Sequence, residues 1–211
     1  MSAKKIGFSL DFSSFEKHFR TEIYWRAYGF FNYITRRYKS SDVNFGQVHI
    51  IGWGNHDPNC HRNSDGILVV NLPVSPAKLQ DACGVDLHEL HIQILSEAIK
   101  VTEKCVELPA ELIRTWIEDF RSQRYVNSWI FKTIRIPGSR KAELRFELTQ
   151  ATFIANLDFI DRDGRVSRSE NVLTTPPDDV FFANKIKTLK LEDGVVVVKD
   201  KAGNLTFECR L

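Results

Sequence analysis

Residues Asp86–Phe120 have the sequence DLHELHIQILSEAIKVTEKCVELPAELIRTWIEDF, which decides the fold. Apolar residues recur in it at steps of three and four, the period of a helix face turned toward a core. Pro109 stands where a second helix would start, because the missing N–H of proline costs no hydrogen bond there. The stretch predicts two amphipathic helices joined at Glu107–Pro109, with Asp86 and Glu89 as a capping pair for the first. We expect a sheet to cover the apolar stripes, which consist of Leu87, Leu90, Ile94, Ala98, Val101, Cys105, Leu112, Ile113, Trp116, Ile117 and Phe120.

Upstream of this helical hairpin, strand and helix patterns follow each other. Ile6–Phe12 alternates apolar with small or polar residues, which predicts a short strand. Ser13 and Glu16 have the spacing of a capping box, and we expect one helix from there to about Arg37, interrupted or not at Gly29.

Two apolar runs separate this helix from the hairpin. Val48–Trp53 and Ile67–Val74 predict two strands that pair as a hairpin across the polar loop Gly54–Gly66. Ser75 and Pro76 then predict the start of a short helix, which we expect to end at Gly84.

Downstream of the hairpin the apolar period changes to two, which is the period of half-buried strands. Asp163-Gly164 suits a tight hairpin turn, because both central residues of that turn need positive φ. Thr174–Asp179 is expected to be a loop. The pattern predicts an antiparallel meander with strands in Trp129–Ile136, Leu144–Leu148, Phe153–Ile160, Ile186–Leu191, Val195–Val198 and Leu205–Leu211.

These elements predict an α+β fold, in which an antiparallel meander of about five to seven strands has helices packed on one face. No repeat, low-complexity tract or flexible linker divides the sequence. We therefore expect a single domain over residues 1–211, helix-rich in 1–124 and a β-meander in 125–211.

Composition bounds the class of protein. The hydrophobic fraction of 43% and the charged fraction of 27% are those of an ordinary soluble globular domain. Neither a membrane-spanning apolar run nor a secretory signal is found, so we expect a cytoplasmic protein without membrane contact. The four cysteines are widely spaced, which favours buried reduced thiols and leaves one disulfide open.

The segment Gly54-Asn55-His56-Asp57 resembles the G-N-H-D segment of the calcineurin-like metallophosphoesterases. In that family the Asn and His of this segment bind a two-metal centre, so Asn55 and His56 would be the corresponding ligands. The family also has D-x-H, G-D-x-x-D and G-H-x-H motifs, and this sequence contains none of them. The resemblance is therefore limited to this one segment.

The same loop gathers further side chains that can bind metals. His56, Asp57, Cys60 and His61 lie within six positions and are candidate ligands for zinc or another transition ion. The alternative is a polar surface loop, which collects such residues by being solvated. His88 and His91 stand three apart in the first helix of the hairpin, and we expect them to lie in the core or on a helix face.

A second candidate site lies in the first forty residues, which hold eight basic and three acidic residues. Tyr24, Trp25, Arg26, Arg36 and Arg37 are candidates for contacting a protein partner or nucleic acid, and Tyr28 and Tyr33 add further aromatic rings. The alternative is one amphipathic helix with an aromatic core face and a solvated basic face.

The leading functional hypothesis is a cytosolic protein-binding module with no catalytic function and no cofactor, for example a small bacterial immunity or inhibitor protein that neutralises a toxin. Free sheet edges and aromatic surfaces are features that dock other proteins. The alternatives are a metal-dependent hydrolase using the His56–His61 loop and a nucleic-acid-binding protein using the basic N-terminal helix.

Overall fold

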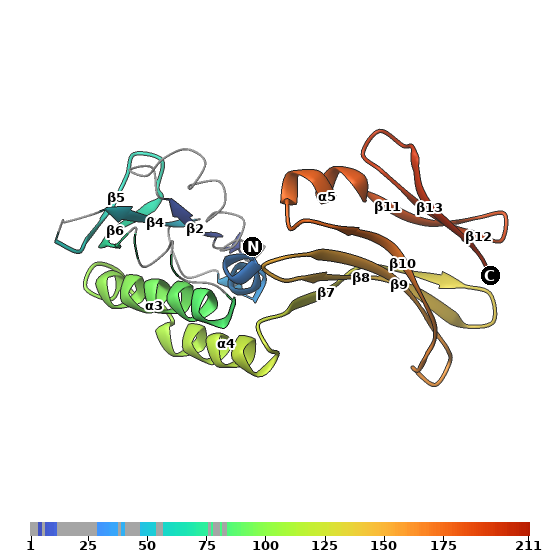
Figure 1. Ribbon diagram of the computed structural model, residues 1–211, viewed down its shortest axis with the longest axis horizontal. Helices are drawn as coiled ribbons and strands as arrows, with labels where there is room; N and C mark the ends of the chain where they lie inside the picture. Colours follow the sequence, from blue (N-terminus) through green and yellow to red (C-terminus); the bar gives the residue numbers. More distant parts are fainter. Residues whose placement is uncertain are drawn as a thin grey trace. The chain divides into compact units, whose positions relative to one another are not determined.

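The computed structural model describes residues 4–5, 7–11, 29–37, 39–40, 47–53, 57–75, 77, 81 and 84–211. The chain divides into two compact units, Met1–Asn127 and Ser128–Leu211 (Figure 1). The division lies close to Arg124, where the sequence changes from helix-rich to strand-rich. The single domain expected over residues 1–211 stays a prediction.

The first unit contains a four-stranded sheet in the order β2-β4-β6-β5. β2 (Gly7–Asp11), β4 (Gln47–Trp53) and β6 (Leu68–Pro73) are parallel, with Val48 opposite Leu68, and β5 (Asn59–Arg62) is antiparallel to β6. β1 (Lys4–Lys5) forms a separate antiparallel pair with β3 (Lys39–Ser40).

The two apolar runs pair with each other as predicted, but the predicted hairpin was wrong. β4 and β6 lie side by side in parallel. Four residues of the expected polar loop form β5, and β5 takes the antiparallel place beside β6. The turn between β5 and β6 is held by the side-chain oxygen of Asn63, which accepts hydrogen bonds from the backbone N–H groups of Asp65 and Ile67. β5 is exposed along most of its length, so its polar sequence resembles that of a loop.

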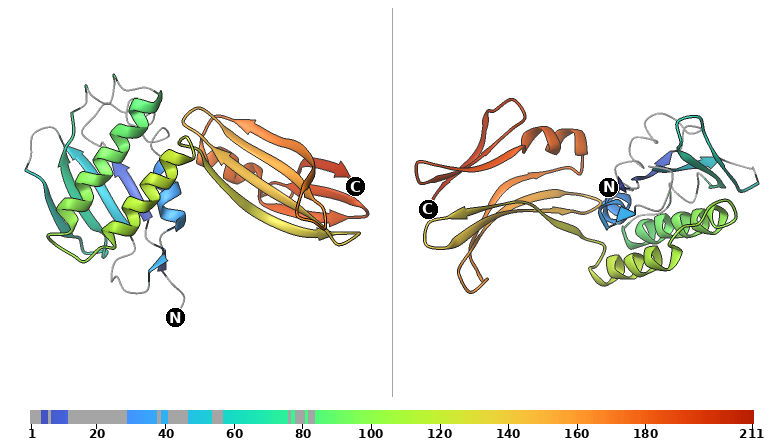
Figure 2. Two further views of the ribbon diagram at one scale, coloured as in Figure 1. Left: turned by 90° about the horizontal axis from the view of Figure 1, so that it is seen from below. Right: turned by 180° about the vertical axis from the view of Figure 1, so that it is seen from behind.

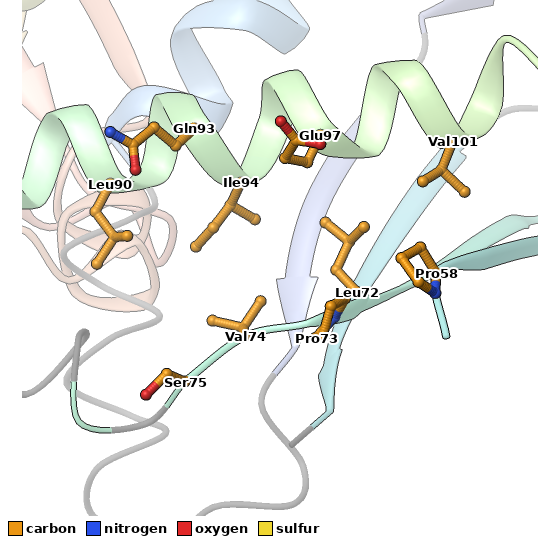
Figure 3. A pocket seen from close by; sticks show the side chains of 10 residues that line it. All are labelled: Pro58, Leu72, Pro73, Val74, Ser75, Leu90, Gln93, Ile94, Glu97 and Val101. Atoms are coloured by element: carbon orange, nitrogen blue, oxygen red, sulfur yellow. The ribbon is translucent and has the colours of Figure 1, made fainter. Parts of the chain in front are cut away.

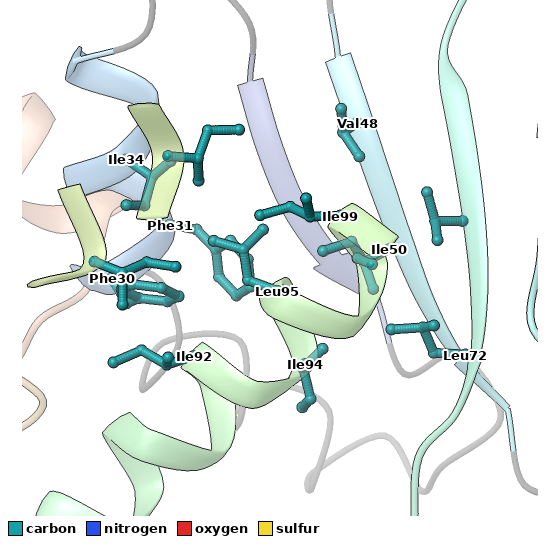
Figure 4. Close-up of a cluster of buried hydrophobic side chains, with 14 of the residues drawn as sticks. Phe30, Phe31, Ile34, Val48, Ile50, Leu72, Ile92, Ile94, Leu95 and Ile99 are labelled. Carbon is teal, nitrogen blue, oxygen red and sulfur yellow. The ribbon is translucent and has the colours of Figure 1, made fainter. Parts of the chain in front are cut away.

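The helical hairpin is confirmed. α3 (Gly84–Thr102) and α4 (Ala110–Ser122) lie along one face of the four-stranded sheet (Figures 1 and 2). α3 begins at Gly84, where the sequence predicted the end of the preceding helix. Residues 77 and 81 are helical, Ser75 is not, and residues 76, 78–80 and 82–83 lie outside the described residues. The core between helices and sheet includes Ile34, Val48, Ile50, Leu72, Ile92, Ile94, Leu95 and Ile99 (Figure 4).

The expected N-terminal strand corresponds to β2, and residues 29–37 are helical, as predicted for the end of the first helix. Phe30, Tyr33 and Ile34 are fully buried, whereas Arg36 is exposed. Residues 12–28, which include the proposed Ser13 capping box, lie outside the described part of the chain.

The second unit is built from two antiparallel sheets (Figure 1). The larger one has the order β10-β9-β8-β7 and consists of β7 (Asn127–Ile136), β8 (Arg140–Leu148), β9 (Phe153–Ile160) and β10 (Val166–Thr175). On one face, alternate residues of β8 and β9 pair across the strands and are buried, among them Leu144 opposite Leu157 and Phe146 opposite Ala155. The period of two therefore predicted the core face of this sheet correctly.

The smaller sheet has the order β11-β12-β13, formed by β11 (Thr188–Glu192), β12 (Val195–Lys199) and β13 (Leu205–Arg210). The sequence did not predict the helix before it, α5 (Asp179–Lys185). Asp178 starts this helix, since its side chain accepts a hydrogen bond from the N–H of Phe181 at 3.2 Å. Phe182 then stacks on Phe153 of the larger sheet, with ring centroids 3.8 Å apart.

The α+β class and the antiparallel meander are confirmed. The helical hairpin, however, packs on the mixed sheet of the first unit, and the meander strands fall into two sheets. No helix in the described part of the chain is long and apolar enough to span a membrane.

Candidate functional site

A pocket of about 270 Å³ opens between α3 and the end of β6 (Figure 3). Leu90, Ile94 and Val101 project into it from α3, while Leu72 and Val74 approach from β6 and the residues after it. The remaining lining residues are Pro58, Pro73, Ser75, Gln93 and Glu97.

The pocket has an apolar floor and a polar rim. Leu72, Val74 and Ile94 are each less than 10% exposed and form the floor. Ser75, Gln93 and Glu97 are exposed and surround it. Such a site favours an apolar group that enters from solvent, with hydrogen-bonding groups at its edge to orient the ligand.

A disulfide lies at one end of this pocket. Cys60 on β5 is bonded to Cys105 just after α3, with Cα atoms 6.6 Å apart. The bond ties the edge of the sheet to the helix that carries Val101, a pocket residue. The predicted reduced state of the cysteines was therefore wrong for this pair, because the fold brings together two residues 45 positions apart; Cys209 is free and buried.

The proposed metal ligands do not converge among the described residues. Asp57 is exposed just before β5, and His61 is exposed on β5. Cys60 is in the disulfide, and His56 lies outside the described part of the chain. Within the described ranges, no group of three or more His, Cys, Asp or Glu side chains is placed to hold a metal ion. Pro58 of the same loop lines the pocket instead.

The basic N-terminal candidates are only partly described, since Tyr24, Trp25 and Arg26 lie outside the described residues. Arg36 is exposed and its Nε donates a hydrogen bond to Asn32 at 2.7 Å. The Arg37 guanidinium lies 3.4 Å from the centroid of the Tyr33 ring. Tyr33 itself is fully buried against Phe120, so its ring cannot stack on a base as the nucleic-acid hypothesis required.

A polar network that the sequence did not reveal joins α3 to the end of α4. Glu89 accepts hydrogen bonds from the Arg121 guanidinium through both carboxylate oxygens and from the Tyr125 hydroxyl at 2.8 Å. These bonds lower the pKa of Glu89, Arg121 contributing most, and the same carboxylate raises the pKa of Tyr125. Glu89 therefore links α3 to the end of α4, whereas the sequence predicted that it would cap α3.

Tyr125 reaches Glu89 because of the way α4 ends. The N–H of Tyr125 bonds to the carbonyl of Phe120, and the N–H of Arg124 bonds to that of Arg121, both at 2.9 Å. This is the Schellman arrangement, in which glycine usually occupies the position taken here by Arg124, at φ 54°. The accompanying apolar contact is the edge-to-face packing of Phe120 and Tyr125, at 5.7 Å.

His88 completes this region. Its ring lies parallel to that of Tyr125, at 4.7 Å between centroids, and meets Phe120 edge-on at 5.5 Å. Burial lowers the pKa of His88 to about 4, although the nearby Glu89 opposes the shift. His88 and His91 are both buried, which confirms the expected core placement.

No family model matches this chain, and no curated protein or solved structure matches it either. The resemblance of Gly54–Asp57 to the metallophosphoesterases thus remains confined to that segment, whose Asn55 and His56 lie outside the described residues.

Proposed function

We propose that this protein is a non-catalytic protein-binding module, and that the pocket between α3 and β6 receives an apolar side chain of its partner. The observation that carries the proposal is the combination of a buried apolar floor with an exposed polar rim, because protein interfaces concentrate their binding energy in such pockets.

The size of the pocket favours a protein side chain over a small molecule. Sites for drug-sized ligands hold about 300 to 1,000 Å³, and this pocket, at about 270 Å³, falls just below that range. One or two anchor side chains of a partner segment fit the smaller volume. Gln93 and Glu97 on the rim supply an amide and a carboxylate that can bond to the partner's backbone.

The particular form we propose is a small inhibitor, such as an immunity protein that neutralises a toxin. A module of this kind needs a preformed surface and no chemistry of its own, which agrees with a pocket lined mainly by residues of α3 and β6. A cytoplasmic location belongs to the same proposal.

The test compares two tryptophan variants of the tagged full chain in pull-downs from native cell extract. Mass spectrometry and metal analysis of the captured samples follow, and calorimetry then uses the purified partner. Gln93→Trp places a large ring at the mouth of the pocket from an exposed position on α3. Thr115→Trp, on an exposed position of α4 that does not line the pocket, is the matched control.

We expect the wild type and Thr115→Trp to capture the same protein in equal amounts, and Gln93→Trp to lose it. Equal capture by both variants would show that the pocket is not the binding site. A partner removed by nuclease or high salt would favour the nucleic-acid hypothesis, and near-stoichiometric zinc, manganese or iron would favour the His56–His61 loop.

A further inference from the structure

The two edges of the larger sheet in the second unit differ in how they can meet another strand. In the order β10-β9-β8-β7, β7 and β10 are the outer strands, and each is ten residues long. An outer strand presents unpaired backbone N–H and C=O groups, which either invite a further strand or are protected against one.

β10 carries the protective features. Its pairing with β9 contains two register shifts, between Val166 and Arg168 and between Asn171 and Leu173. The Arg168 guanidinium also donates a hydrogen bond to the carbonyl of Arg210 on β13 at 3.2 Å, which ties this edge to the smaller sheet. The two register shifts and the bond to β13 keep an added strand away from this edge.

β7 presents apolar side chains. Ile130 is 54% exposed and Phe131 is 39% exposed, although both stand in the middle of a strand. Phe131 stacks on Phe146 of β8 at 4.7 Å, and Trp129 packs edge-on against the same ring at 5.4 Å. The exposed ring of Phe131 is therefore held in place before any partner arrives, which reduces the entropy lost on binding.

The charge of β7 selects the partner. Lys132 and Arg135 are exposed, no acidic residue stands on the strand, and among the described residues neither side chain forms an ion pair. A second copy of β7 would bring four like charges together. A strand with acidic residues would instead pair with them across the edge.

We propose that the outer edge of β7 binds an extended, acidic segment of a partner protein as an added strand. Backbone hydrogen bonds hold the segment, its apolar side chains pack on Ile130 and Phe131, and its carboxylates meet Lys132 and Arg135. This surface lies on the second unit and does not depend on the pocket of the first.

The test uses two labelled peptides, one repeating Val-Val-Glu-Glu and one repeating Val-Val-Lys-Lys, because this pattern places valine and a charged residue on both faces of an added strand. Fluorescence anisotropy gives the affinity, and amide hydrogen exchange of the full chain locates the binding. We expect the glutamate peptide to bind more tightly than the lysine peptide and to protect the amides of β7 but not those of β10.

Three variants sharpen the test. Lys132→Glu combined with Arg135→Glu should weaken the glutamate peptide about tenfold and reverse the preference toward the lysine peptide. Ile130→Asp should also weaken the glutamate peptide, whereas Val166→Asp, at an equally exposed apolar position on β10, should not.

Equal affinity for both peptides, protection of β10, or no protection of β7 amides at saturating peptide would overturn the proposal. Gln93→Trp should leave peptide binding unchanged, so failure of the pocket and failure of the β7 edge give different results.

Discussion

Glu89 on α3 and Arg121 on α4 form a two-pronged ion pair, with Nε 2.8 Å from one carboxylate oxygen and Nη2 2.5 Å from the other. Both side chains are about one-third exposed, so the pair lies at the edge of the core. Since these residues are 32 positions apart, the pair reports directly on the packing of the hairpin.

Glu89→Gln should lower the free energy of unfolding at pH 7 by about 1 to 2 kcal/mol, between the values for exposed and for buried pairs. The folded pKa of Glu89 is lowered, so its contribution is present above the unfolded value near 4.3 and is lost as the pH falls through the folded pKa. Urea unfolding of wild type and variant at pH 7 and pH 3 checks this. An equal difference at both pH values would contradict it.

His88 should make the protein less stable in mild acid. Its folded pKa of about 4 lies below the unfolded value near 6.5, so the unfolded chain binds more protons between these values. The free energy of unfolding should therefore fall as the pH drops from 6.5 to 4, by up to about 3 kcal/mol for this group.

His88→Phe keeps a ring against Tyr125 and removes the titration, so it should lose less stability than the wild type over the same pH range. His61→Gln, on the exposed strand β5, is the control and should follow the wild type. An NMR titration of His88 with a midpoint near 6.5 would refute the prediction.

The disulfide should contribute substantially to stability. Cys105→Ser opens a loop of 45 residues, for which chain entropy gives a loss of about 4 kcal/mol. Unfolding curves with and without reductant should differ for the wild type and coincide for the variant, while Cys209→Ser keeps the difference.

Alkylation followed by peptide mapping provides an independent check. Cys60 and Cys105 should react only after reduction, and modification of both without reductant would contradict the disulfide. The same mapping on protein isolated from each cell compartment tests the expected cytoplasmic location. Disulfides persist mainly in oxidising compartments, so finding the bonded protein only in such a compartment would contradict that location.

Arg124→Gly should stabilise the end of α4. A non-glycine residue at φ 54° is strained, and glycine is the usual residue at this position of a Schellman motif. We expect a net gain of about 0.5 kcal/mol in the free energy of unfolding. This value already includes the loss caused by the greater freedom of glycine in the unfolded chain. Thr115→Gly, inside the same helix, is the control and should lower the free energy of unfolding. A loss of stability in both variants would show that contacts of the Arg124 side chain outweigh the strain of its backbone.

The spacing of apolar residues along the chain predicted the elements that bury one face against the core. α3 and α4 repeat at the helical period, and β8 and β9 alternate, so each shows its buried face in consecutive residues. β5 and α5 were missed because each is short, and each is stabilised by a distant contact, Cys60 with Cys105 and Phe182 with Phe153.

The candidate sites were less accessible to sequence reasoning. The sequence pointed to the loop around His56–His61, but the pocket beside it is lined mainly by residues that a sequence assigns only to the core, such as Leu72 and Ile94. The network of Glu89, Arg121 and Tyr125 also escaped notice, because charged residues on amphipathic helices are usually solvated.

The sequence by itself determined the helical hairpin and the strands that alternate regularly, such as β8 and β9, because periodicity depends on neighbours along the chain. Only the tertiary structure decided that β4 and β6 run parallel, that Cys60 meets Cys105, and that the left-handed end of α4 carries Tyr125 to Glu89. These are choices among partners 20 to 45 positions apart, with Val48 opposite Leu68 at one limit and the disulfide at the other. Their energies depend on which surfaces the whole core can bury, and that information is not contained in any single segment.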